Sequence, residues 1–456
     1  MATNKNITMK QFNGTDYDTL YPKTVASQVD GVYSKEETLS DGTKTAYGLD
    51  SQAVPDDVFA KIPTFFEPVG TIKTTVRTDL GDKWLLCNGN IIDPAEYPEL
   101  SAVLPEADPH ADWAVAENFP LSDFEYTTSF DVQYINEYYI AMSKDYTGGV
   151  FLYAQSLNGP WTKVTVTTSS NRVYFNKMKY LNGYWVICGH IAYATYPCTI
   201  FYATSLSGPW TSKSINSNKN QFITDIIYEN GYYIGCGYAT ATNVDTGMIY
   251  YATSLDGTWT SKSVSSNEFP TLQTIIYENG YYVTTGPRKN GNAGYVFYTQ
   301  DFTGTWSMSN AVSMTSSGTT LTDLNDVKYI NGKWIVCGGT HSGNYSRVFV
   351  ANTLSGAWTC VFRDPDGTGK NLLSFIYANG LYIFRFSNGL YITDNLESMN
   401  TNYATVTFDT AIASIACNDG DYFAGGAESS GFYLNTKYRL PTITTNRSYA
   451  YIKAKE

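Results

Sequence analysis

From about residue 130 to residue 436, the chain is a succession of short stretches in which apolar and polar residues alternate, separated by turns rich in Gly, Asn and Ser. Alternation with a period of two is typical of β-strands that are buried on one face. The dipeptide Asn-Gly recurs between these stretches, and it signals a tight hairpin because both turn residues need positive φ. The pattern therefore predicts pairs of antiparallel strands joined by Asn-Gly turns.

A unit built around this hairpin occurs seven times. Five copies share one pattern, with Asn-Gly two residues after a tyrosine, and they begin at Tyr180, Tyr228, Tyr277, Tyr329 and Tyr377. Two diverged copies begin at Tyr134 and Cys417. The second half of the unit carries a tryptophan, and the copies at Trp161, Trp210, Trp259, Trp306 and Trp358 lie 49, 49, 47 and 52 residues apart. Each unit thus reads as four strands.

Seven units of four antiparallel strands, each about 50 residues long, indicate a β-propeller. A β-helix or another solenoid would have shorter and simpler coils. The expected fold class is therefore all-β, a seven-bladed propeller in which the repeated Tyr and Trp rings pack blade against blade. Cys188, Cys236 and Cys337 recur at one repeat position and are expected to be buried free thiols that act as small apolar side chains.

The seventh unit lacks a fourth strand before the chain changes character at Tyr438. Upstream of the first unit, Trp113 and Phe119-Pro120 mirror the landmarks Trp259 and Phe269-Pro270 of a complete unit. We therefore expect an N-terminal strand that carries Trp113 to close the last blade.

Composition agrees with an all-β reading, since aromatic residues make up 15% of the chain, with 39 Tyr and 9 Trp, and suit pleated surfaces. The net charge of −12 is concentrated in residues 1–112, which hold 9 Lys/Arg against 18 Asp/Glu, so the repeated region is nearly neutral. No basic stripe for nucleic acid and no apolar run of about 20 residues for membrane insertion is seen. The N-terminus lacks the apolar stretch of a secretory signal. Seven cysteines are an odd number and too few for a disulfide scaffold in a chain of this length, so we expect synthesis in a reducing cytoplasm.

Segments on both sides of the repeats carry further motifs. Before them come Pro68-Val-Gly-Thr-Ile-Lys, Trp84-Leu-Leu-Cys-Asn-Gly and Tyr97-Pro-Glu-Leu, and after them Tyr438-Arg-Leu-Pro and Tyr449-Ala-Tyr-Ile-Lys-Ala. Together these resemble the phage tail collar family, across about 60 residues. The resemblance implies a small α+β domain. This chain departs from the family by placing more than 300 residues between Leu100 and Leu440, and a propeller inserted into the collar-like domain accounts for the difference. None of the family's functional residues can be assigned to this chain.

The first 65 residues resemble the N-terminal segments of tail and baseplate proteins from phages of Gram-positive bacteria, as in Tyr17-Asp-Thr-Leu-Tyr-Pro. Residues 51–63 are expected to form a short helix, with Pro55 near its start and Pro63 at its end. The resulting domain prediction is a virion-attachment segment over 1–65, the collar-like domain over 66–108 and 437–456, and the propeller over 109–436.

A sialidase-type glycosidase is the enzyme worth weighing, because Ser254-Leu-Asp-Gly-Thr-Trp resembles an Asp-box turn. That turn is one residue too short, and the ring arginines fall at unrelated repeat positions: Arg172, Arg288, Arg347, Arg363 and Arg385. A carboxylate pair could still serve a glycosidase, and Asp323 and Asp326 are expected in a loop.

Metal chemistry has weak support. His110, His190 and His341 have no metal-ligand spacing, and Asp364-Pro-Asp366-Gly lacks the terminal Glu of a calcium loop and is read as a plain turn. We expect no enzyme activity, no metal site and no cofactor.

A propeller has two unlike faces. One, here called the turn face, carries the turns between the first and second and between the third and fourth strands, which in this chain are short and uniform. The other, the loop face, carries the second-to-third loops and the blade-to-blade connections, which vary freely. Function concentrates in such loops, so the ligand-binding residues predicted are Tyr193, Tyr196, Tyr238, Arg288, His341 and Tyr345.

The function expected is a virion tail fibre or baseplate receptor-binding protein that attaches through the loop face to the bacterial surface, as a partner of other tail proteins. A near-neutral ring favours an uncharged or weakly charged cell-wall glycan. The alternatives are a purely structural baseplate protein and, third, a glycosidase. A homotrimer is expected by analogy with collar-containing phage proteins.

Overall fold

The computed structural model describes residues 9–12, 17–20, 35–38, 44–47, 69–75, 80, 83–87, 92, 96–104, 108–110, 113–116, 119–123, 130–143, 149–166, 173–191, 198–216, 221–241, 244–264, 271–286, 295–310, 323–339, 346–364, 371–418, 421–426, 431–435 and 449–454. The helix expected over 51–63 lies outside these residues. Within them, no helix is long and apolar enough to span a membrane.

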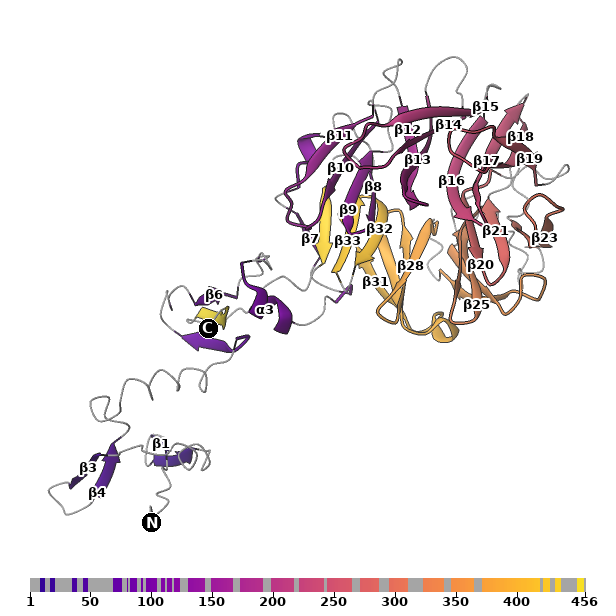
Figure 1. Ribbon diagram of the computed structural model, residues 1–456. Coiled ribbons are helices and arrows are strands. Elements are labelled where there is room, and N and C mark those ends of the chain that lie inside the picture. The colour runs from indigo at the N-terminus through magenta and orange to yellow at the C-terminus, as the bar shows by residue number, and fades with distance from the viewer. Residues whose placement is uncertain are drawn as a thin grey trace, which may run out of the picture. The chain divides into compact units, whose positions relative to one another are not determined.

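Seven four-stranded antiparallel sheets form the blades of a ring (Figure 1), which confirms the predicted fold class. The first four blades are β8(Phe130–Ile135), β9(Tyr138–Ser143), β10(Val150–Ala154) and β11(Thr162–Thr165); β12(Val173–Leu181), β13(Tyr184–Ile191), β14(Cys198–Ala203) and β15(Thr211–Asn216); β16(Gln221–Glu229), β17(Tyr232–Ala241), β18(Val244–Ala252) and β19(Thr260–Ser263); β20(Thr274–Glu278), β21(Tyr281–Gly286), β22(Tyr295–Thr299) and β23(Ser307–Asn310). The last three are β24(Asp323–Ile330), β25(Lys333–Gly339), β26(Ser346–Ala351) and β27(Thr359–Arg363); β28(Ser374–Ala378), β29(Leu381–Phe386), β30(Gly389–Thr393) and β31(Ala404–Thr407), with the 3-10 turn η4(Leu396–Ser398); and β32(Ile412–Asn418), β33(Asp421–Gly426) and β34(Phe432–Asn435) with β7(Ala114–Val115).

The Asn-Gly dipeptides form the turn between the first and second strands, as predicted. In the second blade Asn182 has φ 49° and Gly183 has φ 83°, and the same pair of positive values recurs through the sixth blade. In the first blade Glu137 replaces the glycine and still adopts φ 69°. The amide of the turn asparagine then reaches the next blade, since Asn230 Nδ2 donates to the hydroxyl of Tyr282 at 3.0 Å. The turns therefore fix the hairpins and join neighbouring blades.

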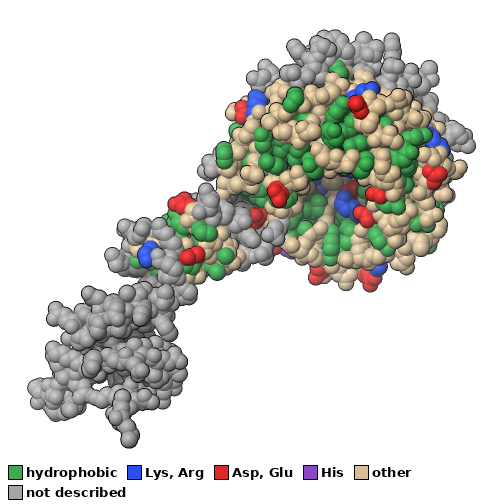
Figure 2. Space-filling model, in the orientation of Figure 1, with side chains coloured by type: hydrophobic (Ala, Val, Ile, Leu, Met, Phe, Trp, Pro, Cys, Tyr) green, Lys and Arg blue, Asp and Glu red, His purple; other side chains and the backbone are tan. Residues whose placement is uncertain are grey.

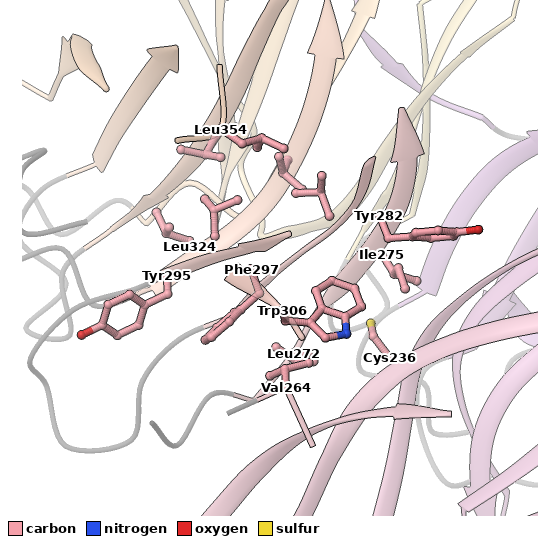
Figure 3. Close-up of a cluster of buried hydrophobic side chains, with 14 of the residues drawn as sticks. Cys236, Val264, Leu272, Ile275, Tyr282, Tyr295, Phe297, Trp306, Leu324 and Leu354 are labelled. Atoms are coloured by element: carbon pink, nitrogen blue, oxygen red, sulfur yellow. The ribbon is translucent and has the colours of Figure 1, made fainter. Parts of the chain in front are cut away.

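The spaces between blades are filled by aromatic and aliphatic side chains. Figure 3 shows one such core, where Trp306 and Phe297 of the fourth blade lie near Leu324 of the fifth and Cys236 of the third. Cys188, Cys236 and Cys337 are all fully buried and free, as expected for thiols that act as small apolar side chains. The repeated rings thus supply the cohesion between blades.

The seventh blade takes its fourth strand from the N-terminal side of the ring. β7 pairs with β34 through Leu434 opposite Ala114 and Tyr433 opposite Val115. The Trp113 ring meets Phe408 edge to face at 5.2 Å, and its Nε1 donates to the carbonyl of Pro109 at 2.9 Å. A 3-10 turn, η2(Leu121–Asp123), follows before the first blade begins. Strands from both ends of the repeat region therefore share one sheet.

A second compact unit comprises Met1–Leu104 and Leu440–Glu456, and the ring lies within Pro105–Arg439. In the second unit β35(Tyr449–Lys453) pairs with both β5(Ile72–Thr75) and β6(Trp84–Leu86), beside α3(Pro98–Val103), whose Leu100 is fully buried. Segments that resemble the collar family thus come from before and after the repeat region and form one three-stranded sheet. The N-terminal part of this unit contains two separate hairpins, β1(Met9–Phe12) with β2(Tyr17–Leu20) and β3(Lys35–Thr38) with β4(Lys44–Tyr47).

Candidate functional site

Tyr238 is the one predicted ligand-binding residue that the structure describes. It lies in β17, not in a loop, because the hairpin ladder continues outward to the pair Ala241 and Val244. The connection between the second and third strands of this unit, Gly237–Gly247, is one of the variable loops expected on the loop face, and it is mostly strand. The other predicted residues lie outside the described part of the chain: Tyr193, Tyr196, Arg288, His341 and Tyr345.

Tyr238 belongs to a row of four aromatic side chains at the loop-face ends of the second and third blades. Tyr174 of β12 stacks on His190 of β13 with centroids 4.5 Å apart, and Phe222 of β16 stacks on Tyr238 at 4.6 Å. Between the blades, His190 meets Phe222 edge to face at 5.0 Å. All four rings are partly exposed. They form a continuous aromatic surface, here called the aromatic row, across a blade junction.

The backbone beneath the row requires glycine. A Cβ at Gly189 would overlap the carbonyl oxygen of Tyr174, and one at Gly237 would overlap that of Phe222. Glycine allows this close approach of two backbones, so each ring pair is carried on a tightly closed hairpin end. Burial lowers the pKa of His190 to about 4, because it disfavours the imidazolium. The row is therefore uncharged near neutral pH.

A second group of side chains, which are charged, lies on the innermost strands. The position three residues before the repeated tyrosine carries Asp131 in the first blade, Lys177 in the second, Asp225 in the third and Asp326 in the fifth. Asp326 lies in β24, so the expectation that Asp323 and Asp326 occupy a loop is wrong. The alternating pattern of Asp323–Ile330 pairs with β25 over its whole length, with one β-bulge between Leu324 and Asp326.

The carboxylates of Asp225 and Asp326 hold neighbouring blades together. Asp225 accepts the N–H of Ile226 at 2.8 Å and that of Ile275 in the next blade at 3.2 Å. Asp326 likewise accepts from Val327 at 2.9 Å and from Phe375 in the next blade at 3.1 Å. Lysines complete both sites.

Lys179 lies 2.7 Å from Asp225 and Lys328 lies 3.1 Å from Asp326. With their oxygens satisfied in this way, the two carboxylates act as inter-blade acceptors.

Two cations, Lys177 and Arg385, lie close enough to the inner-strand carboxylates to feel their charge. Lys177 Nζ lies 3.8 Å from Asp131, with 40% of its side chain exposed, and its pKa is raised mainly by the charge of Asp131. Arg385 is 8% exposed and donates to Ser374 Oγ at 3.1 Å and to the carbonyl of Ile412 at 2.7 Å. Burial lowers the pKa of Arg385 to about 10. Figure 2 shows blue and red side chains within the hollow of the ring.

The remaining candidates for chemistry do not assemble into a catalytic or metal site within the described residues. Arg347 and Arg363 face each other across β26 and β27 of the fifth blade, whereas Arg385 belongs to the sixth. No group of three His, Cys, Asp or Glu side chains suited to a metal is found in the residues the structure describes. Asp364 is 1% exposed, with its N–H donating to the carbonyl of Ser346 at 3.1 Å.

Sequence reasoning missed the inner-strand charges and three members of the aromatic row. The inner-strand signal was present, since a charged residue stands three places before the repeated tyrosine in four of the seven units. Tyr174, His190 and Phe222 are harder to find from the sequence than the inner-strand charges. Only cross-strand pairing across the bulges in β12 and β16 brings them together.

The larger unit is a seven-bladed β-propeller whose last blade is closed by an N-terminal strand. A structure of YCF48 bound to D1 peptide matches it with a TM-score of 0.50 at 13% identity, covering 75% of this chain and 99% of that one. YCF48 from Cyanidioschyzon merolae matches with a TM-score of 0.50 at 10% identity, covering 71% of this chain and 98% of that one. At these identities the likeness shows the fold alone. No family model and no curated protein matches the chain.

Proposed function

We propose that this chain is a ligand-binding propeller of a phage tail or baseplate, which attaches the virion to a glycan of the bacterial surface through the loop face. The observation that carries the binding role is the aromatic row of Tyr174, His190, Phe222 and Tyr238. Partly exposed rings offer large, rigid contact area at low entropic cost, and a neutral row suits the apolar faces of sugar rings better than a charged polymer.

The virion role rests on the segments that resemble the tail collar family and on the N-terminal resemblance to tail proteins. The pairing of β35 with β5 and β6 supports a collar-like unit that contains the propeller as an insertion. In this arrangement the second unit and the N-terminal segment hold the protein on the particle, in contact with other tail proteins. The protein would be synthesised in the host cytoplasm and then incorporated into the virion.

Binding is proposed in preference to catalysis. A glycosidase needs one carboxyl group to give up a proton and a second to attack or to activate water. The inner-strand carboxylates are instead occupied, since Asp225 and Asp326 each accept two backbone N–H groups and a lysine. This supports a structural role for them and leaves the aromatic row as the stronger candidate site.

The test measures binding of the purified full chain to Gram-positive cells. We expect saturable binding that the double variant Tyr174→Ala/Tyr238→Ala weakens roughly tenfold or more, the loss typical of a central aromatic contact. Tyr377→Ala, on the turn face, is the matched control and should bind as the wild type does. Binding that does not saturate favours the purely structural baseplate role, and release of reducing sugar favours the glycosidase.

A further inference from the structure

The turn face carries a repeated aromatic arrangement that the loop-face proposal does not use. In each of four consecutive gaps between blades, three tyrosines pack around the same hydrophobic cluster: one from the start of the second strand, one from the third strand, and one from the first strand of the next blade. These tyrosine triads are Tyr138, Tyr153 and Tyr180; Tyr184, Tyr202 and Tyr228; Tyr232, Tyr251 and Tyr277; and Tyr281, Tyr298 and Tyr329.

Each triad packs against an aromatic side chain of the next blade. In the first gap Tyr138 lies 5.6 Å from Tyr153 and 6.1 Å from Trp185, and Tyr180 lies 5.0 Å from the same tryptophan. In the fourth, Tyr281 lies 6.0 Å from Tyr298, and Tyr329 lies 4.8 Å from Trp334. The rings are therefore held in place, and all twelve keep part of their surface exposed, with Tyr180 reaching 37%.

The hydroxyl groups divide the tyrosines of this face into two classes. Those of the second strand that pack between the blades are bonded by turn asparagines, as where Asn331 donates to Tyr382 and Asn230 to Tyr282. By contrast, none of the twelve triad hydroxyls has a hydrogen-bond partner among the described residues. A tyrosine hydroxyl both donates and accepts, so each triad offers three rings and three uncommitted polar groups.

The other three gaps show that the fold does not need the triads. Where the sixth blade meets the seventh, the same positions hold Leu381, Ile392 and Cys417. Lys333 and Val350 replace the first two tyrosines in the fifth gap, and Asp421 and Leu434 replace them in the seventh. Ile392 and Leu434 are buried, at 1% exposure each. Aliphatic side chains therefore close the gaps as well, and partly exposed tyrosines are an addition to packing.

Charge on this face disfavours an anionic ligand. Two lysines of the outer strands are engaged by turn carbonyls of the next blade, since Lys213 donates to Asp256 at 2.8 Å and Lys262 donates to Thr303 at 2.5 Å. Glu229 and Glu278 stand at the ends of β16 and β20 beside the triads. A polyanion would meet carboxylates here, not free ammonium groups.

We propose that the four tyrosine triads are equivalent binding sites for a neutral hexopyranose polysaccharide. A pyranose ring presents an apolar C–H face to an aromatic ring and a rim of hydroxyls to phenol groups, the combination of apolar wall and few polar groups that ligand sites use. Four copies in successive blades match a ligand that itself repeats, because weak sites engaged together by one polymer bind with higher avidity. This assignment depends on neither the aromatic row nor a virion role.

The test titrates the full chain with three neutral hexasaccharides, maltohexaose, cellohexaose and chitohexaose, by calorimetry and ligand-observed NMR. At least one of these hexasaccharides should bind with a Kd of about 1 mM per site, as expected for single weak sites. The titration should give more than one site per chain. Tyr184→Leu/Tyr202→Ile copies Leu381 and Ile392 of the sixth blade, and should remove one site in four. The same pair of changes in all four gaps should abolish binding.

Tyr377→Ala is the control on the same face, because Tyr377 lies in the fifth gap, which has no triad, and it should leave the number of sites unchanged. If a Leu/Ile variant does not fold, the variant Tyr184→Phe/Tyr202→Phe replaces it in the test. This variant removes only the two hydroxyl groups, and it should weaken binding at one site several-fold. The proposal is overturned if none of the three hexasaccharides binds, or if a folded Leu/Ile variant keeps the wild-type capacity. Failure here leaves adsorption through the aromatic row unaffected, so the two proposals are tested separately.

Discussion

The variant Phe119→Ala tests whether the segment that carries β7 and Phe119 holds the ring closed. Its side chain is 7% exposed, stacked at 4.5 Å on Phe432 of the seventh blade and edge to face at 5.1 Å with Trp161 of the first. Truncating a buried phenylalanine to alanine costs about 3–5 kcal/mol, which includes the cavity left behind. Because the ring bridges the two blades that meet at the closure, we expect Phe119→Ala to destabilise the propeller by about 4 kcal/mol.

The assay is equilibrium urea denaturation of the full chain, followed by tryptophan fluorescence, with thermal unfolding as a second readout. A shift of about 2 °C per kcal/mol for a domain of this size predicts a fall in Tm of about 8 °C. Val115→Ala is the control, since Val115 lies in β7 but is 52% exposed, and it should change stability by less than about 0.5 kcal/mol. A Phe119→Ala protein within about 1 kcal/mol of wild type would refute closure by this segment.

Two further predictions concern the inner strands and the aromatic row. Asp225→Ala should destabilise the ring by about 3 kcal/mol in urea denaturation, because the buried N–H groups of Ile226 and Ile275 lose their acceptor; a loss below about 0.5 kcal/mol would mean that water replaces the carboxylate. The pKa of His190 is lowered to about 4 from an ordinary value of 6.5, so the unfolded chain binds a proton first as pH falls. Stability should therefore drop between pH 6.5 and 4 by up to about 3 kcal/mol, and His190→Gln should flatten that part of the profile.

The blade count and the turn geometry were predictable because they depend on local signals. An Asn-Gly pair needs positive φ wherever it occurs, and Asn182 and Gly183 adopt it. The missing fourth strand of the last unit was also predictable, since the first five units each carry a tryptophan just before the fourth strand and Trp113 lies upstream of them in a similar sequence.

The candidate sites were less predictable because they depend on which blade faces which. Periodicity assigns Asp225 to a strand but not its acceptor role for Ile275 in the next blade. The second-to-third connections vary in length and composition between units, which led to a loop over Gly237–Gly247, whereas backbone pairing extends the hairpin there and places Tyr238 beside Phe222. The triads escaped notice for a similar reason, because their three members come from three strands of two blades.

The central claim is that this propeller binds a bacterial surface glycan. It is tested most directly by equilibrium binding of the full chain to wall polysaccharide purified from Gram-positive cells and freed of protein, immobilised and competed with the same polysaccharide in solution. We expect saturable binding that the soluble polysaccharide removes and that protease treatment of the polysaccharide leaves unchanged. Binding to intact walls that disappears when their proteins are digested, with none to the purified polysaccharide, would contradict it.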